Sequence, residues 1–475
     1  MKKRLFSILT AIAAAAALCC PAAAATLSWT EDPATSMTVT WRSDASGEQT
    51  LQLVAEDDFE AHGFAGAREE RVYGRDISPD GNGAYHYEVT VRGLTPGERY
   101  VCRVGDNNGW SGELRFRTDD PLARSVTFAY FGDAQPGGSA GYEGFAALAE
   151  SVYTAHPELS FAMMGGDMVN SGVSPAQFDA FSAAVESAMP GLPLFAVNGN
   201  HESNYPGGKP ELYLDIFALP RNGPKGFTEE MYSFDAGNVH IVAVNSWVFS
   251  GEQKLTEEDY DRLSEWLKND LASSTADWQI VVTHIPVQAV HSDMTAERLK
   301  EAWGPILEDY GVDLVLEGHQ HVYSRSVPLY RGKTDYENGI TYIMGVSGSK
   351  FYSSSDETRA ARVVYNTANC QIIRSDDMTL SVQTVDADGN EMDYISLPQR
   401  TGAQTRLAYV TRLWMAAGSP QAGESPFADT DSPAMAWAAE AGIIEGYGNG
   451  IAGPDDLITD WQIALIDARM NGENK

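Results

Sequence analysis

Short apolar runs in the middle of this chain end, one after another, in polar loops. The runs and the loops that follow them are 126–131 before Gly132-Asp133, 159–164 before Gly165-Gly166-Asp167, 194–197 before Asn198-Gly199-Asn200-His201, 278–282 before Thr283-His284, and 312–316 before Glu317-Gly318-His319. Helical segments at about 144–155 and 175–188 separate the first three runs. Strands that alternate with helices predict a layered α/β domain, and such domains place their sites beyond the carboxyl ends of the strands.

These loops carry side chains that bind transition metals. They are Asp133-Ala134-Gln135, Gly166-Asp167, Gly199-Asn200-His201-Glu202, His284-Ile285-Pro286 and Gly318-His319-Gln320-His321. Asp, Asn and His are hard-to-borderline donors that suit Zn, Mn or Fe. Two ions roughly 3.5–4 Å apart need a bridging carboxylate and open positions for hydroxide and phosphate. In the Gly-His-x-His element, an extended backbone is expected to point His319 and His321 to the same side of the chain.

Each loop taken alone has an ordinary structural explanation. An Asp after a strand often caps a helix or forms a turn, and Asn200 is also compatible with a turn. His284 by itself is compatible with a hydrogen-bonded core histidine. The prediction of a metal site therefore depends on five motifs in one order, each at a predicted strand end.

The segments on either side have different patterns. Residues 27–118 predict an all-β sandwich, because short strands such as 37–41, 85–91 and 100–104 are separated by Gly, Asp and Pro turns. The last stretch, 405–472, is Ala-rich and predicts a small helical module. We therefore expect a multidomain chain with an α/β layered domain over residues 124–398.

The motif set resembles the calcineurin-like metallophosphoesterases, and within them the purple acid phosphatase branch. Residues 37–41 and 94–111 are similar to the fibronectin-like N-terminal domain of that branch, and residues 231–240 to a hairpin in the middle of its catalytic domain. The resemblance covers residues 27–398. It implies a central β-sandwich core flanked by helices, two divalent or trivalent transition metal ions (Fe, Zn or Mn) and a phosphate-ester substrate.

The resemblance also implies roles for individual residues. The first metal is expected to bind Asp133, Asp167 and His321. The second is expected to bind Asp167, Asn200, His284 and His319, so that Asp167 bridges the two ions. His201 is expected to contact the phosphate and assist charge or proton transfer.

Two positions depart from the family pattern. Asn170 stands where the purple enzymes have a tyrosine ligand of ferric iron, so we expect no purple chromophore. Gln135 stands where the wider superfamily has a histidine, and its amide oxygen is expected to act as a weak fourth ligand of the first metal. His291 falls near the substrate-facing histidines of the branch, as a second candidate catalytic residue or as a surface-loop histidine.

The start of the chain reads as a secretory signal peptide over residues 1–25, with a basic first segment, an apolar stretch at 6–18 and small residues before Thr26. An uncleaved anchor and a lipoprotein at Cys19 are the alternatives. No later segment reads as a transmembrane helix. The two remaining cysteines, Cys102 and Cys370, fall in different predicted domains, which favours separate thiols, with a disulfide bridge as the alternative.

The net charge of −33 argues against nucleic acid or anionic membranes as partners. At the C-terminus, a segment preceded by Thr405-Arg406 is similar to an S-layer homology module, through residues 425–430, 437–438, 441–450, Pro454 and 458–459. That resemblance implies binding to anionic cell-wall polymer. The second Thr-Arg position reads Thr459-Asp460, and only about one repeat is present. A helical packing appendage is the alternative.

From these patterns we predict a secreted or surface-associated phosphoesterase that hydrolyses phosphate monoesters with a metal-bound hydroxide. A phosphodiesterase or nucleotide hydrolase is the alternative on the same site. A surface binding protein that has lost activity is the alternative of another class, and Asn170 and Gln135 favour it. Ser-His-Asp hydrolysis and P-loop chemistry are set aside, because no Gly-x-Ser-x-Gly element lies at a predicted strand-to-helix turn and no Gly-x-x-x-x-Gly-Lys-Ser/Thr loop is present in the sequence.

Overall fold

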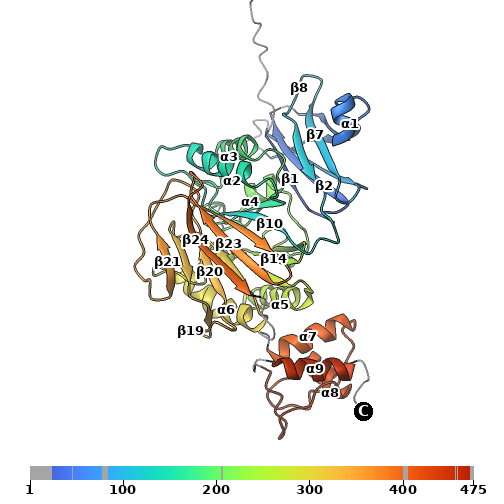
Figure 1. The fold of residues 1–475 in the computed structure, drawn as a ribbon, viewed down its shortest axis with the longest axis vertical. Coiled ribbons are helices and arrows are strands. Elements are labelled where there is room, and N and C mark those ends of the chain that lie inside the picture. The colour runs from blue at the N-terminus through green and yellow to red at the C-terminus, as the bar shows by residue number, and fades with distance from the viewer. Residues whose placement is uncertain are drawn as a thin grey trace, which may run out of the picture.

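The computed structural model describes residues 24–470, apart from 45, 78–83, 205–206, 399–404, 455 and 457. Residues 1–23 of the predicted signal peptide lie outside the described residues. Among the helices that are described, none is long and apolar enough to cross a membrane. Figure 1 shows a β-rich N-terminal part, a central α/β part and a helical C-terminal part in sequence order.

The N-terminal part consists of two antiparallel sheets. One sheet has the order β1-β2-β6-β5, and the other has the order β4-β3-β7-β8 with β9 also paired to β7. Their bounds are β1 Ala25–Ser28, β2 Ser36–Ser43, β3 Glu48–Ala55, β4 Arg68–Tyr73, β5 Arg75–Asp76, β6 Tyr85–Arg92, β7 Arg99–Asp106, β8 Gly109–Trp110 and β9 Leu114–Arg117, with helix α1 at Glu56–His62. Trp41 and Tyr87 stack at 5.2 Å in the core. The predicted strands at 37–41, 85–91 and 100–104 are confirmed.

The central part contains two larger sheets. One has the order β12-β11-β10-β22-β23-β24, and the other has the order β13-β14-β15-β16-β20-β17-β21. The strands of the first are β10 Thr127–Phe131, β11 Phe161–Met164, β12 Leu194–Ala196, β22 Cys370–Ser375, β23 Thr379–Val385 and β24 Glu391–Pro398. Those of the second are β13 Tyr232–Ala236, β14 Val239–Val244, β15 Trp278–Thr283, β16 Leu314–Glu317, β17 Tyr323–Ser326, β20 Thr341–Met344 and β21 Ala360–Val364.

Helices cover the outer faces of these sheets. They are α2 Glu143–Ala155, α3 Pro175–Ala188, α4 Glu211–Ile216, the 3-10 helix η1 Ser246–Ser250, α5 Glu257–Ser273 and α6 Met294–Asp309, and a small hairpin is formed by β18 Leu329–Tyr330 and β19 Lys333–Thr334. Successive residues of a strand point to opposite faces. In β16, Leu314 and Leu316 enter the core shared with the six-stranded sheet, whereas Val315 packs in the core of α5 and α6. The predicted β-sandwich flanked by helices is therefore what the structure has.

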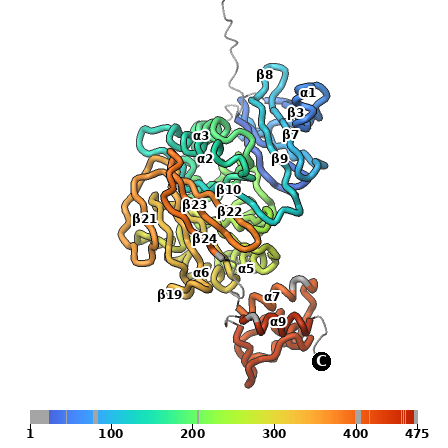
Figure 2. Tube along the Cα trace, viewed as in Figure 1, coloured from blue at the N-terminus to red at the C-terminus, as the bar shows by residue number. Residues whose placement is uncertain are grey.

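The strands that carry the motifs run parallel. β10, β11 and β12 pair in parallel register, and so do β14, β15, β16 and β20. β22, from late in the chain, returns to pair antiparallel with β10 (Figure 2). An isolated parallel bridge between Asp133 and Val346 joins the carboxyl ends of β10 and β20. The loops of both sheets therefore meet at one edge of the sandwich.

The C-terminal part contains helices α7 Arg406–Ala416, α8 Pro433–Glu440 and α9 Asp460–Met470. They enclose an apolar cluster of their own, which includes Val410, Met435 and Ile444. The backbone N–H of Thr405 donates to the Asp309 carbonyl at 3.1 Å, at the end of α6. The likeness of this part to an S-layer homology module stays a prediction.

Candidate metal centre

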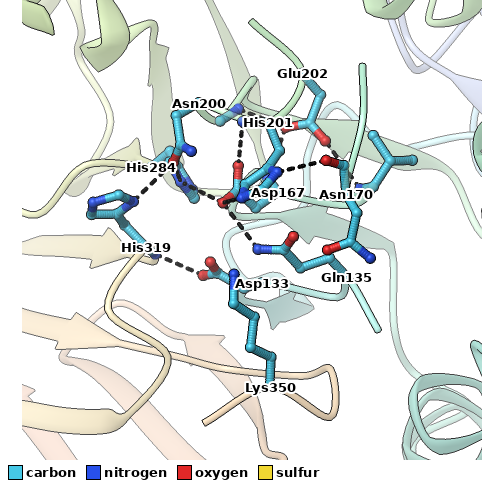
Figure 3. Close-up of polar contacts among 12 residues, drawn as sticks. Asp133, Gln135, Asp167, Asn170, Asn200, His201, Glu202, His284, His319 and Lys350 are labelled. Carbon is cyan, nitrogen blue, oxygen red and sulfur yellow. Dashed lines mark hydrogen bonds and ion pairs between the residues drawn. The ribbon is translucent and has the colours of Figure 1, made fainter. Parts of the chain in front are cut away.

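Figure 3 shows the side chains that converge where the strands end. Asp133 follows β10, Asp167 follows β11 and Asn200 follows β12, while His284 and His319 follow β15 and β16 of the facing sheet. Parallel strands end at the same edge of a sheet, so residues far apart in the sequence become neighbours. The structure brings together the predicted ligands Asp133, Gln135, Asp167, Asn200, His284, His319 and His321.

In His284, His319 and His321, the ring nitrogen that points away from the centre (the outer nitrogen) is held by a hydrogen bond, and the other (the inner nitrogen) faces the centre. His284 Nδ1 lies 2.8 Å from the Gly165 carbonyl, and His321 Nδ1 lies 3.0 Å from the Lys350 carbonyl. His319 Nε2 lies 2.9 Å from Asp293 Oδ2. Carbonyl and carboxylate oxygens only accept, so the outer nitrogens carry the protons. The inner nitrogens of the neutral rings are therefore bare, which is the form that binds a metal.

The inner atoms of the site face one another as acceptors. Asn200 Oδ1 lies 3.1 Å from His284 Nε2 and 2.9 Å from His319 Nδ1. Asp167 Oδ2 lies 3.3 Å from His284 Nε2, and the other inner nitrogen, on His321, lies 3.3 Å from Asp133 Oδ2. Lone pairs that face each other in a buried place repel, and a proton or a metal cation between them removes the repulsion.

Two side-chain groups have metal-binding geometry, and they share Asp167. One contains Asp167, His284 and His319, and the other contains Asp133, Asp167 and His321, with the ligand atoms of each group within 4.8 Å of one another. Asp133 Oδ2 and Gln135 Oε1 are buried and accept no hydrogen bond from the residues that the structure describes. Such unpartnered oxygens fit the second group as extra donors to a cation. The residues present therefore fit a pair of metal ions bridged by Asp167.

The electrostatics agree with a cation site. Burial raises the pKa of Asp133 to about 7, because the charged carboxylate has lost water. Burial lowers the pKa of His284, but the Asp167 and Asp133 carboxylates and the Gly165 carbonyl together raise it to about 10, so the His284 ring attracts either a proton or a metal ion. Burial and the Lys350 ammonium lower the pKa of His321 to about 3, which keeps that imidazole neutral.

The backbone around the site is strained where the ligands sit. Asp167, His319 and His321 have φ values of 48°, 73° and 48°, in the left-handed region of the backbone that residues other than glycine rarely adopt. The prediction of an extended backbone through His319 and His321 is therefore wrong. The two rings reach the same centre because two left-handed residues bend the loop, not because alternate residues of a strand point the same way.

A buried glutamate holds the Asp167 loop in this conformation. Glu202 accepts four backbone N–H groups, from Asp167 and Gly199 at 2.8 Å each and from Met168 and Val169 at 2.9 and 3.2 Å. Gly199 must be glycine, because a Cβ there would lie 2.1 Å from Asp167 Oδ1. Glu202 therefore fixes the backbone that carries the expected bridging carboxylate.

The two candidate catalytic histidines both line the cavity that contains this centre. His201 Nδ1 lies 2.7 Å from the Asn170 carbonyl, and its Nε2 lies 3.8 Å from Asp167 Oδ2. His291 lies on the wall of the same cavity, where its Nδ1 is 3.1 Å from Ser355 Oγ. His201 thus directs its Nε2 toward the expected bridging carboxylate, whereas the His291 ring contacts Ser355 on the cavity wall.

Asn170 does not take the place of the tyrosine ligand. Its side-chain amide donates to the Pro136 carbonyl at 2.9 Å, and its own carbonyl holds His201. Gln135, by contrast, lies inside the site, where its amide nitrogen is 3.2 Å from Asp167 Oδ2 and 3.2 Å from His321 Nε2.

A cavity of about 610 Å³ opens onto the centre. Its lining residues are Asp167, Asn200, His201, His291, Ser292, Asp293, His319, Gln320, His321, Lys350, Phe351, Tyr352 and Ser353. Asp293 and the segment 350–353 were not anticipated from the sequence. The segment follows the run Thr341–Met344 and Gly345, so the same pattern of a strand followed by a glycine loop would have found it. Asp293 does not follow a strand and a glycine loop, so this pattern would not have found it.

Cys102 and Cys370 are separate, buried thiols. They belong to different sheets, β7 and β22. The interpretation as separate thiols is therefore correct, and neither residue takes part in the site.

Two family models match the chain. The calcineurin-like phosphoesterase model matches residues 126–323, and the model of the purple acid phosphatase N-terminal domain matches residues 23–118. The first covers all five motif loops and the strands of the two central sheets from β10 to β16. The second covers the N-terminal sheets. Both families agree with the resemblance drawn from the sequence.

Several curated proteins are similar to this chain. Acid phosphatase type 7 of Mus musculus is 29% identical over 335 residues, which is 64% of this chain and 70% of that protein. Purple acid phosphatase 15 of Arabidopsis thaliana is 30% identical over 181 residues, which is 37% of this chain and 33% of that protein. Acid phosphatase type 7 of Homo sapiens is 29% identical over 272 residues, 52% of this chain and 58% of that protein. The chain thus spans between one third and seven tenths of these relatives.

Solved structures share the fold. Purple acid phosphatase PPD1 from yellow lupin (Lupinus luteus) seeds has a TM-score of 0.63 at 18% identity, over 83% of this chain and 76% of that one. PhoD has a TM-score of 0.57 at 13% identity, over 78% of this chain and 91% of that one. The chain therefore contains a calcineurin-like phosphoesterase domain over residues 126–323 and a purple acid phosphatase N-terminal domain over residues 23–118, and the solved structures share its fold.

Proposed function

We propose that this protein hydrolyses phosphate monoesters at the centre built around Asp167. One observation carries the proposal: inward-facing acceptor atoms surround two potential cation positions that share this carboxylate. Two bound transition metal ions would supply Lewis-acid charge and a hydroxide nucleophile there. Asp133, Gln135 and His321 would hold one ion, and Asn200, His284 and His319 would hold the other.

The residues around the ions would orient the substrate and manage the proton. His201 is fixed through Nδ1 by the Asn170 carbonyl, so its Nε2 faces the cavity. That nitrogen is placed to stabilise the phosphoryl group or to protonate the leaving alkoxide. His291 would act only on the part of the substrate that extends along the cavity wall.

The experiment that tests this function combines metal content with turnover. Natively purified protein is expected to contain about two transition metal ions per chain. It is expected to hydrolyse a chromogenic monoester such as p-nitrophenyl phosphate faster than bis-(p-nitrophenyl) phosphate. A faster diester reaction would favour the phosphodiesterase alternative. Metal binding without turnover of either ester would favour the binding protein.

We also propose that the protein is exported and associated with the cell surface. The basic and apolar start of the sequence and the S-layer-homology-like segment at its other end support this proposal. A single module of this kind would bind wall polymer weakly, since such attachment depends on several modules acting together. Fractionation of native cells that express the full chain or a version ending after about residue 400 tests the idea. Equal release of both forms into the medium would leave the segment as a packing appendage.

A further inference from the structure

Lys350 places a positive charge on the wall of the cavity that contains the metal centre. Figure 3 shows its side chain extending from the loop toward Asp133. Within the described part of the chain, the ammonium forms no ion pair, and its nearest aromatic contact is the Tyr352 ring at 5.4 Å. Among the residues that line the cavity, Lys350 is the one Lys or Arg. The site of this very acidic protein therefore contains one uncompensated cationic side chain.

The position of Lys350 is set by backbone contacts to two expected metal ligands. Ser347 and Gly348 donate their N–H groups to the Asp133 carbonyl at 3.0 and 2.6 Å. The Lys350 carbonyl accepts from His321 Nδ1 at 3.0 Å, and the Tyr352 N–H donates to the His321 carbonyl at 3.1 Å. The loop is thus fixed at both ends to the centre.

The close fit of this loop requires a glycine before Lys350. A Cβ at Gly348 would lie 2.3 Å from the Gln135 carbonyl oxygen, too close for any side chain. The loop can therefore reach the ligand strands only with glycine at this position. These contacts fix the backbone position of Lys350. From there its side chain extends toward Asp133 (Figure 3).

We propose that Lys350 binds the non-bridging phosphoryl oxygens of the substrate and makes the site selective for dianionic monoesters over monoanionic diesters. The inference rests on the proposed phosphoesterase function and goes further, because it assigns the preference to one side chain. A monoester carries about two negative charges above its second pKa of about 6, and a diester carries one. An ammonium on the wall of this cavity therefore stabilises the monoester more than the diester, because it attracts the larger charge more strongly.

The chain offers a matched control for this lysine. Lys300 lies in an adjoining cavity of about 340 Å³, where its ammonium donates to Gln288 Oε1 at 3.0 Å. Lys300→Gln removes the same charge from the protein without touching the wall of the metal cavity. Lys350→Met removes the ammonium and keeps the length of the side chain, whereas Lys350→Arg keeps the charge.

The experiment uses full-length, metal-loaded protein at pH 7.5. Calorimetry gives the Kd of inorganic phosphate, elemental analysis gives the metal content, and turnover gives kcat/KM for p-nitrophenyl phosphate and bis-(p-nitrophenyl) phosphate. In Lys350→Met we expect phosphate to bind about tenfold to hundredfold more weakly, as for the loss of a charge-assisted hydrogen bond. We expect the monoester kcat/KM to fall by a similar factor and the diester value to change by less than about threefold. Lys350→Arg should retain most of the phosphate affinity and most of the monoester kcat/KM. Lys300→Gln should match the wild type in both.

The outcomes separate this inference from the function on which it rests. If the wild type hydrolyses neither ester, the proposed function fails, and the phosphate Kd of Lys350→Met against Lys300→Gln alone decides the role of Lys350. Equal losses on monoester and diester would overturn the inference. An unchanged phosphate Kd, a wild type that does not bind phosphate, or a fall in metal content of Lys350→Met would overturn it as well.

Discussion

Asp293 holds His319 at the candidate metal centre: its Oδ2 lies 2.9 Å from His319 Nε2, while His319 Nδ1 lies 2.9 Å from Asn200 Oδ1. The other oxygen of Asp293 accepts the N–H groups of Thr295 and Ala296, so the same carboxylate caps helix α6. The hydrogen bond from His319 lowers the pKa of Asp293 to about 2, against the effect of burial. One side chain therefore ties the first turn of a helix to an expected metal ligand.

We predict that Asp293→Asn weakens metal binding by about tenfold to hundredfold, because a neutral amide orients and polarises His319 less well than a carboxylate. Asn is a good helix cap, so this variant should keep its stability. Asp293→Ala should lose metal affinity and about 1 kcal/mol of helix stability as well. Metal titration against a chelator and urea denaturation measure the two effects. Equal metal affinity in Asp293→Asn and the wild type would contradict the assignment.

Removal of the expected bridge should have the largest effect on the site. In Asp167→Ala, both metal groups lose the ligand that they share, so we expect loss of both ions and a fall in kcat by orders of magnitude. Elemental analysis and turnover of a chromogenic monoester check this together. Near-normal turnover in Asp167→Ala would show that the site has been assigned wrongly.

The iron-loaded protein is expected to lack an intense visible absorption band. Asn170 stands at the position of the tyrosine ligand and its side chain bonds to the Pro136 carbonyl, so no tyrosinate is expected on the metal. A visible spectrum of the iron-loaded wild type is the measurement. A strong band would instead implicate Tyr352, whose ring centroid lies 4.7 Å from that of His321, and Tyr352→Phe should then abolish it.

A pH-dependent contribution to stability is expected away from the metal centre. Burial lowers the pKa of His240, but Asp235 and Asp270 accept from its two nitrogens at 2.7 and 3.0 Å and raise the pKa to about 9. The unfolded value is about 6.5, so the stabilisation is fully present below that pH and is lost as the pH rises through 9. The loss is on the order of 3 kcal/mol.

Comparison with His240→Gln isolates this effect from other titrating groups. The difference in free energy of unfolding between wild type and variant, from urea titrations at several pH values, should shrink between about pH 6.5 and 9. A difference that stays constant over this range would mean that His240 is not charged in the folded protein.

Local sequence patterns located most of the central fold. The apolar runs at 126–131 and 278–282 correspond to β10 and β15, and the helix expected at 175–188 is α3. These elements could be predicted because their signals are local: periodicity, glycine after the strand and proline at the first helical turn. The expected ligands Asp133 and His284 could be located at the candidate centre for the same reason, since each directly follows its strand.

The sequence by itself determined which residues form the centre, because five strand-end motifs leave few other uses for their Asp, Asn and His side chains. Only the tertiary structure decided how these residues are held. Asp293 and Lys350 reach His319 and His321 from 26 and 29 residues away, across loops whose path no local pattern records. The left-handed backbone of His319 and His321 likewise depends on contacts with distant strands. Such contacts form only when two sheets pack face to face, because that packing sets the distance between their loops.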